Sequence, residues 1–252
     1  MSSTKEYFFE LERERRDAWI QEQLGSEELD DQSEAYEQLA FEYQNMMDAY
    51  SEEAEYRWLE RQSFHEQYID FGSDLRATME LMRQSEQAPH AAIISKLVYA
   101  HGVTLLETMI STSVQALVVR DTRFFLNIAK QIDSINKSKK YSLSEIAKHP
   151  KGLQGLILAI LSELSYHNPA TIKTVLCALI GDRMNGLDAS PIVPICEKRH
   201  DIVHRNGKTI DDQVIELSST EVHLALQTID AFAADVSRRI KDALADLEQT
   251  SE

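Results

Sequence analysis

Glycine and proline are scarce in this 252-residue chain, which contains only 8 Gly and 5 Pro. An all-β fold of this length needs many tight turns, and these two residues are the usual means of making them. Their scarcity therefore favours long helices. Because hydrophobic residues still make up 43% of the sequence, the chain can bury a substantial core, as one large domain or as two smaller ones.

Cysteine is also rare, since Cys177 and Cys196 are the only two. They form no CxxC pair and do not stand at the Cys/His spacing of a zinc site. We therefore predict no metal site. Because the sequence also has no glycine-rich loop of the kind that cradles phosphates, we predict no small-molecule cofactor. Each cysteine is expected to be a small buried residue, which fits a reducing compartment.

A long uninterrupted hydrophobic run is missing as well. The most apolar stretches are Leu97–Val119, which His101 and Glu107 interrupt, and Leu153–Leu161, which is too short to cross a bilayer. The N-terminus, MSSTKEYFFELERERR, becomes charged at once and lacks the apolar segment of a signal peptide. We expect a cytoplasmic protein that makes no membrane contact.

Negative charge is abundant but unevenly distributed. Residues 1–86 hold 23 Asp and Glu against 8 Lys and Arg, so they carry a net charge of −15 of the total −16. An acidic total argues against general nucleic-acid binding by the whole chain. One segment differs: the basic stretch, defined here as Arg120–Lys151, has a local net charge of +5. It is either a solvated face or a set of phosphate contacts.

Capping patterns divide the chain into helices. Boxes of Ser and Glu three residues apart, in which each side chain caps the other's backbone N–H, predict helix starts at Ser3, Ser142 and Ser218. In the first third, helices are expected up to Gly25, from about Ser26 to Tyr50, from Ser51 to about Phe71, and from Ser73 or Asp74 to a stop before Pro89. Later helices are expected at about Ala91–Val119, Arg123–Ile135, Gly152–Tyr166, Pro169–Met184, Pro191–Arg205 and Ser218–Leu247.

The loop-like stretch QSEQAPH, at Gln84–His90, is the best domain boundary. We expect an acidic helical module over residues 1–88, followed by a helical bundle over residues 89–252. The first third contains 13 of the 19 aromatic residues, whereas a disordered acidic tail would be poor in them. The module is therefore expected to be folded, or to fold against a partner.

The motif segment, defined as CEKRHDIVHRNG at Cys196–Gly207, concentrates groups that can carry out chemistry at the end of a predicted helix. Histidine titrates near neutrality and can act as a general acid or a general base. A guanidinium can hold the phosphoryl oxygens with two parallel contacts. His204 is accordingly the candidate acid or base, Arg199 the phosphate clamp, and His200 an orienting or proton-sharing group.

The motif segment also resembles the signature of HEPN domains, in which an arginine is followed by a polar residue and, a few residues later, by a histidine. Here these are Arg199, His200 and His204, and the resemblance extends over about Ala91–Arg239. It implies a metal-independent endoribonuclease that leaves 2′,3′-cyclic phosphate and 5′-hydroxyl ends, with a composite cleft across a homodimer. It also implies a toxin or antiviral-defence role, with an antitoxin or regulatory protein as a further partner.

The other candidate site residues surround this motif. Glu107, Asp201 and Arg205 are predicted to support it, and the predicted RNA contacts are Lys137, Lys139, Lys140 and Lys198. Residues five apart on a helix differ by about 140° in direction, so Arg199 and His204 do not form one stripe, whereas residues four apart, such as His200 and His204, do.

Less specific interpretations remain open from the sequence. A histidine at a helix C-terminus can simply complement the helix dipole, and Arg199 can form a structural ion pair with Glu107 or Asp201. Glu107 itself is either a buried partner of the motif or a solvated residue. The alternative function is a catalytically silent HEPN module that binds or scaffolds another protein. A third hypothesis has the acidic module covering the basic cleft in place of RNA.

Overall fold

The computed structural model describes residues 4–25, 30–135 and 140–249, and over these ranges the chain is all-α. It forms ten α-helices and two short 3-10 helices there, and the β-type pairing within these ranges is a single bridge between Lys208 and Val214. The predicted all-α fold class is confirmed. The capping box predicted at Ser3 lies outside the described residues.

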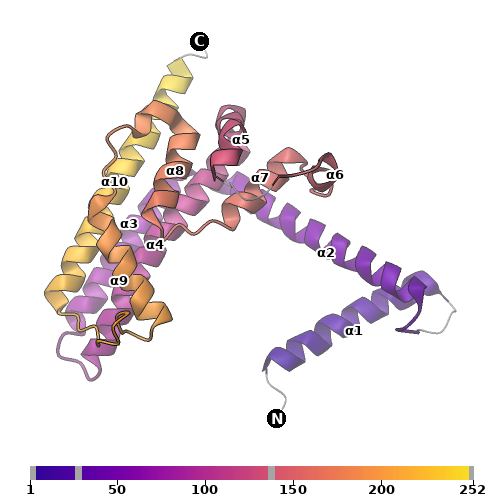
Figure 1. The fold of residues 1–252 in the computed structure, drawn as a ribbon, viewed down its shortest axis with the longest axis horizontal. Coiled ribbons are helices and arrows are strands. Elements are labelled where there is room, and N and C mark those ends of the chain that lie inside the picture. Colours follow the sequence, from indigo (N-terminus) through magenta and orange to yellow (C-terminus); the bar gives the residue numbers. More distant parts are fainter. Residues whose placement is uncertain (1–3, 26–29, 136–139, 250–252) are drawn as a thin grey trace. The chain divides into compact units, whose positions relative to one another are not determined.

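Figure 1 shows the helices, coloured along the chain. In chain order they are α1 (Thr4–Leu24), α2 (Glu34–Arg61), α3 (Phe64–Gln84), α4 (Ala91–Arg120), α5 (Thr122–Ile135), α6 (Leu143–Ile146), α7 (Leu153–Ser162), α8 (Pro169–Ile180), η1 (Gly181–Met184), η2 (Ser190–Ile192), α9 (Val193–His204) and α10 (Ser219–Gln249).

Two predicted helix breaks in the first third are wrong. α2 continues through Ser51, and α3 continues through Gly72. The break lies instead just before α3, where the Ser63 side chain accepts a hydrogen bond from the N–H of Glu66. An isolated glycine costs a helix only about 1 kcal/mol relative to alanine, so the cap at Ser63 decides where the helix starts.

The chain divides into two compact units, Met1–Arg57 and Trp58–Glu252. The first consists of α1 and most of α2. The sequence analysis places the boundary after residue 88, but α3 packs within the second unit against α4 and α10. Its buried side chains, among them Phe71, Leu75 and Met82, join the large hydrophobic core there. QSEQAPH is thus a loop between two packed helices.

α4 is the central helix of the second unit. It contacts α3, α5, α7, α8, α9 and α10, and most of its side chains from Met109 to Val118 are buried. A Cβ atom at Gly102 would lie 2.3 Å from a Leu226 methyl carbon, so this glycine lets α10 pack closely against α4. By length and composition α4 is apolar enough to cross a membrane, but 67% of its most apolar window is buried inside this unit.

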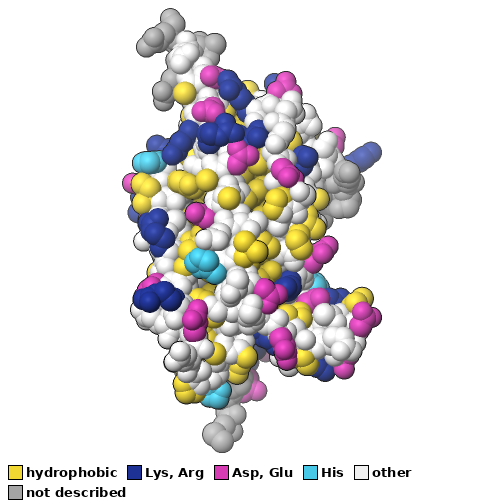
Figure 2. All heavy atoms as spheres, turned by 90° about the vertical axis from the view of Figure 1, so that its left-hand side faces the viewer, with side chains coloured by type: hydrophobic (Ala, Val, Ile, Leu, Met, Phe, Trp, Pro, Cys, Tyr) yellow, Lys and Arg dark blue, Asp and Glu magenta, His cyan; other side chains and the backbone are white. Residues whose placement is uncertain are grey.

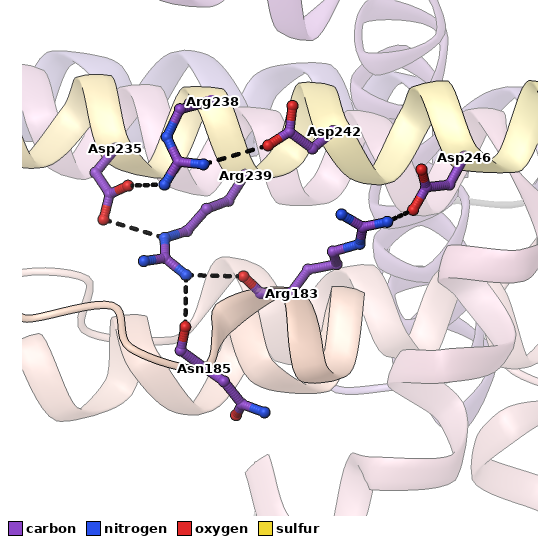
Figure 3. A network of polar contacts seen from close by, with 7 residues as sticks. All are labelled: Arg183, Asn185, Asp235, Arg238, Arg239, Asp242 and Asp246. Atoms are coloured by element: carbon purple, nitrogen blue, oxygen red, sulfur yellow. Dashed lines mark hydrogen bonds and ion pairs between the residues drawn. The ribbon is translucent and has the colours of Figure 1, made fainter.

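A polar network joins α10 to the segment that leads into α9 (Figure 3). Arg239 donates to the backbone carbonyls of Arg183 and Asn185, at 2.9 and 2.7 Å, and to the Asp235 carboxylate at 3.0 Å. Burial acts to raise the pKa of Asp235, but hydrogen bonds from Arg238 and Arg239 outweigh it and hold this pKa below its usual range. The network therefore anchors the chain before the motif helix.

Arg239→Ala is expected to lower the free energy of unfolding by about 2 kcal/mol, because the guanidinium is mostly buried and satisfies two carbonyls. Arg238→Ala is the matched control. Its side chain is largely exposed and contacts only carboxylates, so the loss there should stay below about 1 kcal/mol. Urea unfolding measures both, and equal losses would show that the carbonyl contacts contribute little.

Candidate functional site

The motif helix α9 begins at Val193, two residues after the predicted start at Pro191, because Ser190–Ile192 forms a 3-10 helix, and it ends within one residue of the predicted end. Pro194 occupies the first turn, where its missing N–H leaves no hydrogen bond unmade. The helix ends at His204, and Asn206 and Gly207 follow with positive φ angles of 53° and 76°. The N–H of Gly207 donates to the carbonyl of Ile202 at 3.1 Å, so the turn caps the end of the helix.

The turn after α9 lies against α4. A Cβ atom at Gly207 would come within 2.6 Å of the Lys96 ammonium nitrogen, so only glycine fits here without displacing that side chain. The following loop folds back on itself through the Lys208–Val214 bridge, and the N–H of Ile215 donates to the carbonyl of Gly207. The C-terminal end of the motif segment is thereby fixed against the core.

Arg199 faces into the bundle, toward Glu107 of α4. Its Nη2 lies 3.6 Å from Glu107 Oε2, and both side chains are less than a fifth exposed. Burial raises the pKa of the Glu107 carboxyl, while Arg199 and His167 act to lower it. Of the two interpretations left open by the sequence, the structure places Glu107 as a partly buried partner of the motif.

The Arg199–Glu107 pair leaves one hydrogen-bond donor and one acceptor without a hydrogen-bond partner among the residues described. The donor is Arg199 Nε and the acceptor is Glu107 Oε1, and both atoms are buried. An unsatisfied buried donor or acceptor costs about 1–3 kcal/mol. An unsatisfied buried group in a folded protein calls for an explanation, which can be a bound water, strain or a functional role.

His167 is a member of this cluster that the sequence analysis missed. Its Nδ1 lies 3.4 Å from Glu107 Oε1, which makes an ion pair when the imidazole is protonated. The buried Tyr166 precedes it, and Asn168 follows as the cap of α8, accepting from the N–H of Ala170. No local pattern marks His167, because only the packing of the α7–α8 connection beside α4 brings it to Glu107.

His200 and His204 lie together on the exposed side of α9. Their ring centroids are 4.7 Å apart with an angle of 42° between the planes, and both side chains are exposed. They therefore share a face, as the spacing predicts. Arg199 is directed to the core side of the helix, so the structure does not bring the guanidinium and the two imidazoles into one pocket of this chain.

The remaining predicted charges of α9 are paired within the second unit. Asp201 forms an ion pair with Arg205, one turn away on the same helix. Lys198 lies 3.8 Å from Glu221, in the first turn of α10, and 6.0 Å above the Tyr99 ring. Asp201 thus pairs with Arg205 and not with Arg199.

The basic stretch is only partly described. Lys140 is exposed, whereas Lys137 and Lys139 lie outside the described residues. Within the same stretch, the capping box at Ser142 is present as predicted, with hydrogen bonds in both directions between Ser142 and Glu145. The box at Ser218 and Glu221 is likewise present at the start of α10.

Neither cysteine has the character of a nucleophile. Cys196 is buried, and burial raises the pKa of its thiol to about 11, while Cys177 is half-buried. Over residues 4–25, 30–135 and 140–249, no group of three or more His, Cys, Asp or Glu side chains is placed to hold a metal ion. The titratable side chains that lie close together in this region are those around Glu107 and those on α9.

Comparison with known proteins returns no match, either to a family model, to a curated protein or to a solved structure.

Removing the Arg199 guanidinium should reveal how much free energy the burial of the Glu107 carboxylate costs. Arg199→Ala is expected to destabilise the fold by about 2 kcal/mol at pH 7.5, because it leaves a partly buried carboxylate without its cation. A raised carboxyl pKa means that the folded state holds the proton more tightly, so stability is lost as pH rises through that pKa. The loss should therefore be smaller at pH 5 than at pH 7.5.

Two controls accompany this measurement. Glu107→Gln added to Arg199→Ala should recover part of the loss at pH 7.5, because it removes the isolated charge. Arg205→Ala, which breaks the more exposed pair with Asp201, should cost within about 0.5 kcal/mol at either pH. A pH-independent loss that Glu107→Gln leaves unchanged would show that the Glu107–Arg199 pair is not electrostatically coupled.

Proposed function

We propose that this chain is a metal-independent endoribonuclease of the HEPN type. The observation that carries the proposal is the arrangement of the motif side chains on α9. Arg199 pairs with Glu107 on the core side of the helix, while His200 and His204 are exposed on the other side. The motif lies at the C-terminal end of α9, which packs against α4. α4 is the central helix of this all-α unit and carries Glu107.

The chemistry follows from the residue types. The ribose 2′-hydroxyl gives its proton to a base and forms a bond to the adjacent phosphorus, the bond from phosphorus to the 5′-oxygen breaks, and an acid protonates that oxygen. His204 is the proposed acid or base, and His200 orients it or takes the second proton transfer. Arg199 is the group proposed to stabilise charge on the phosphoryl oxygens, through the part of its guanidinium that is not buried against Glu107.

A homodimer completes the proposed site. Because Arg199 faces the core side of α9 and His204 points about 140° away from it, one chain does not bring its arginine and its histidines to the same side of the helix. A second copy placed beside α9 would add its own motif. Large hydrophobic side chains near the motif are available for such a contact, namely Ile93, Leu97, Val203 and Leu224, all about half exposed or more.

The surface around α10 has room for both apolar and phosphate contacts. Figure 2 shows hydrophobic side chains across the middle of this face, with Lys and Arg side chains gathered mainly above them and acidic ones interspersed. We propose Lys140, Lys137, Lys139 and Lys198 as the RNA contacts, with Asp201 and Arg205 supporting the motif. The proposed setting is a cytoplasmic toxin or antiviral-defence effector, with an antitoxin or regulatory protein as partner.

The second candidate function is a catalytically silent HEPN module that binds or scaffolds another protein. Its support is the internal pairing of the cations: Arg199 with Glu107, and Lys198 with Glu221. Cations that are already neutralised bind phosphates less strongly. The overall net charge of −16 favours this alternative as well.

The first test is cleavage of a mixed-sequence RNA in EDTA by folded protein. His204→Ala is expected to reduce the rate at least ~10²-fold, since general acid–base catalysis contributes that much or more. Arg199→Lys keeps a cation beside Glu107 but loses the two-pronged contact, and we expect a similar loss. His223→Ala removes an exposed histidine of α10 outside the motif and should leave the rate unchanged. Cleavage that needs Mg²⁺, or that survives His204→Ala, would refute the mechanism.

The composite site is tested by mixing two inactive variants. If each centre takes its arginine from one chain and its histidine from the other, then heterodimers of Arg199→Lys with His204→Ala contain one intact centre. Random exchange should then restore about a quarter of the wild-type activity per dimer. If both groups act within one chain, the mixture stays as inactive as its components.

A further inference from the structure

The first compact unit, Met1–Arg57, buries few of its large apolar side chains. Ile20 and Tyr36 are buried, whereas six others are between 43% and 66% exposed: Tyr7, Phe8, Phe9, Phe41, Met47 and Tyr50. A two-helix hairpin with so small a core has little hydrophobic stabilisation of its own. The exposed apolar residues are therefore the part of this unit that needs an explanation.

The two helices contact each other at the end nearest their connecting loop. Arg16 donates to the Tyr36 hydroxyl at 2.9 Å, and that hydroxyl donates to Asp17 at 2.7 Å. The rings of Trp19 and Tyr43 lie 5.5 Å apart. Away from the loop, α1 and α2 diverge (Figure 1).

One face of α1 extends along the whole hairpin, from the closed end, where the two helices are in contact, to the open end, where they diverge. At 100° per residue, Ile20, Arg16 and Phe9 lie within about 40° of one another around the helix axis. Ile20 is fully buried, and Arg16 contacts α2, but Phe9 is 60% exposed. The face that packs on α2 near the loop is thus uncovered where the helices separate.

α2 shows the same change along its corresponding face. Tyr36, Tyr43, Met47 and Tyr50 lie within about 60° of one another, with the seven-residue spacing that helical bundles use for buried seams. Tyr36 is buried and Tyr43 half-buried, while Met47 and Tyr50 are 43% and 65% exposed. We call the faces through Phe9 and through Tyr50 the inner faces.

The net charge of this unit indicates which kind of partner can pack against the inner faces. The unit has 17 Asp and Glu against 5 Lys and Arg, a net charge of −12. A second copy of this hairpin would bring another −12 against it. A helix with lysines and arginines around an apolar stripe matches both the apolar inner faces and the acidic surroundings, and a third helix is the natural element to pack between two diverging helices.

We propose that the open end of the α1–α2 hairpin is a docking site for a cationic amphipathic helix of a partner protein. Phe9 of α1 and Met47 and Tyr50 of α2 receive the apolar stripe of that helix, and the acidic residues of the unit pair with its cations. This site is independent of the proposed RNA chemistry.

The test uses full-length protein and two synthetic helical peptides of about 15 residues with equal positive charge. One carries leucines at i, i+3, i+4 and i+7 among lysines, and the other has alanine in place of every leucine. The inner-face variant is Phe9→Ser with Tyr50→Ser. Its matched control is Tyr7→Ser with Phe41→Ser, which removes one equally exposed aromatic from each helix. Around the helix axes, Tyr7 lies about 160° from Phe9 and Phe41 about 180° from Tyr50.

The Lys/Leu peptide is expected to bind wild-type protein, and the inner-face variant should weaken binding at least ~10-fold, equal to about 1.4 kcal/mol. The control variant should stay within about twofold, because positions outside the buried centre of an interface are energetically near-neutral. Circular dichroism and thermal unfolding check that both variants keep the wild-type helix content.

Three results would overturn the proposal. Equal binding of the Lys/Ala peptide would reduce the interaction to charge alone. Equal losses in the inner-face and control variants would show that the inner faces are not the site. Absence of peptide binding, together with a change of oligomeric state in the inner-face variant alone, would identify a second copy of this chain as the occupant.

Discussion

The contact between Arg199 and Glu107 is the interaction on which the rest of the candidate site depends. It joins the motif helix α9 to the central helix α4 through two mostly buried side chains of opposite charge. Burying either charge alone is costly, so the pair fixes how α9 is rotated about its axis. With Arg199 turned inward, the geometry of a helix directs His204 about 140° away, and His200 and His204 emerge together on the exposed side.

The surrounding structure holds this arrangement from several directions. Arg239 anchors the segment before α9, and Gly207 seats the turn after it against Lys96 of α4. His167 approaches the remaining oxygen of Glu107. The pair is not fully satisfied even so, because Arg199 Nε and Glu107 Oε1 have no hydrogen-bond partner among the residues described. The contacts around the pair therefore hold the motif helix in place, and His200 and His204 are exposed on the surface of α9.

Part of this arrangement could be predicted from short stretches of the sequence. The capping boxes at Ser142 and Ser218 and the turn at Asn206–Gly207 are properties of a few neighbouring residues, and all three are present. His200 and His204 share a face because they stand one helical turn apart. His167 and α3 were not predictable in this way. Their places depend on packing between segments far apart in the chain, and a polar loop such as QSEQAPH can join two packed helices as well as two domains.

The central claim is that this site cleaves RNA by attack of its own 2′-hydroxyl, with histidine and arginine in place of a metal. The most direct measurement is the chemical nature of the RNA ends that wild-type protein produces in EDTA. The account predicts 2′,3′-cyclic phosphate on one fragment and 5′-hydroxyl on the other. Products with 5′-phosphate and 3′-hydroxyl ends, which arise from attack by water, would contradict it, and so would intact RNA after incubation with folded protein.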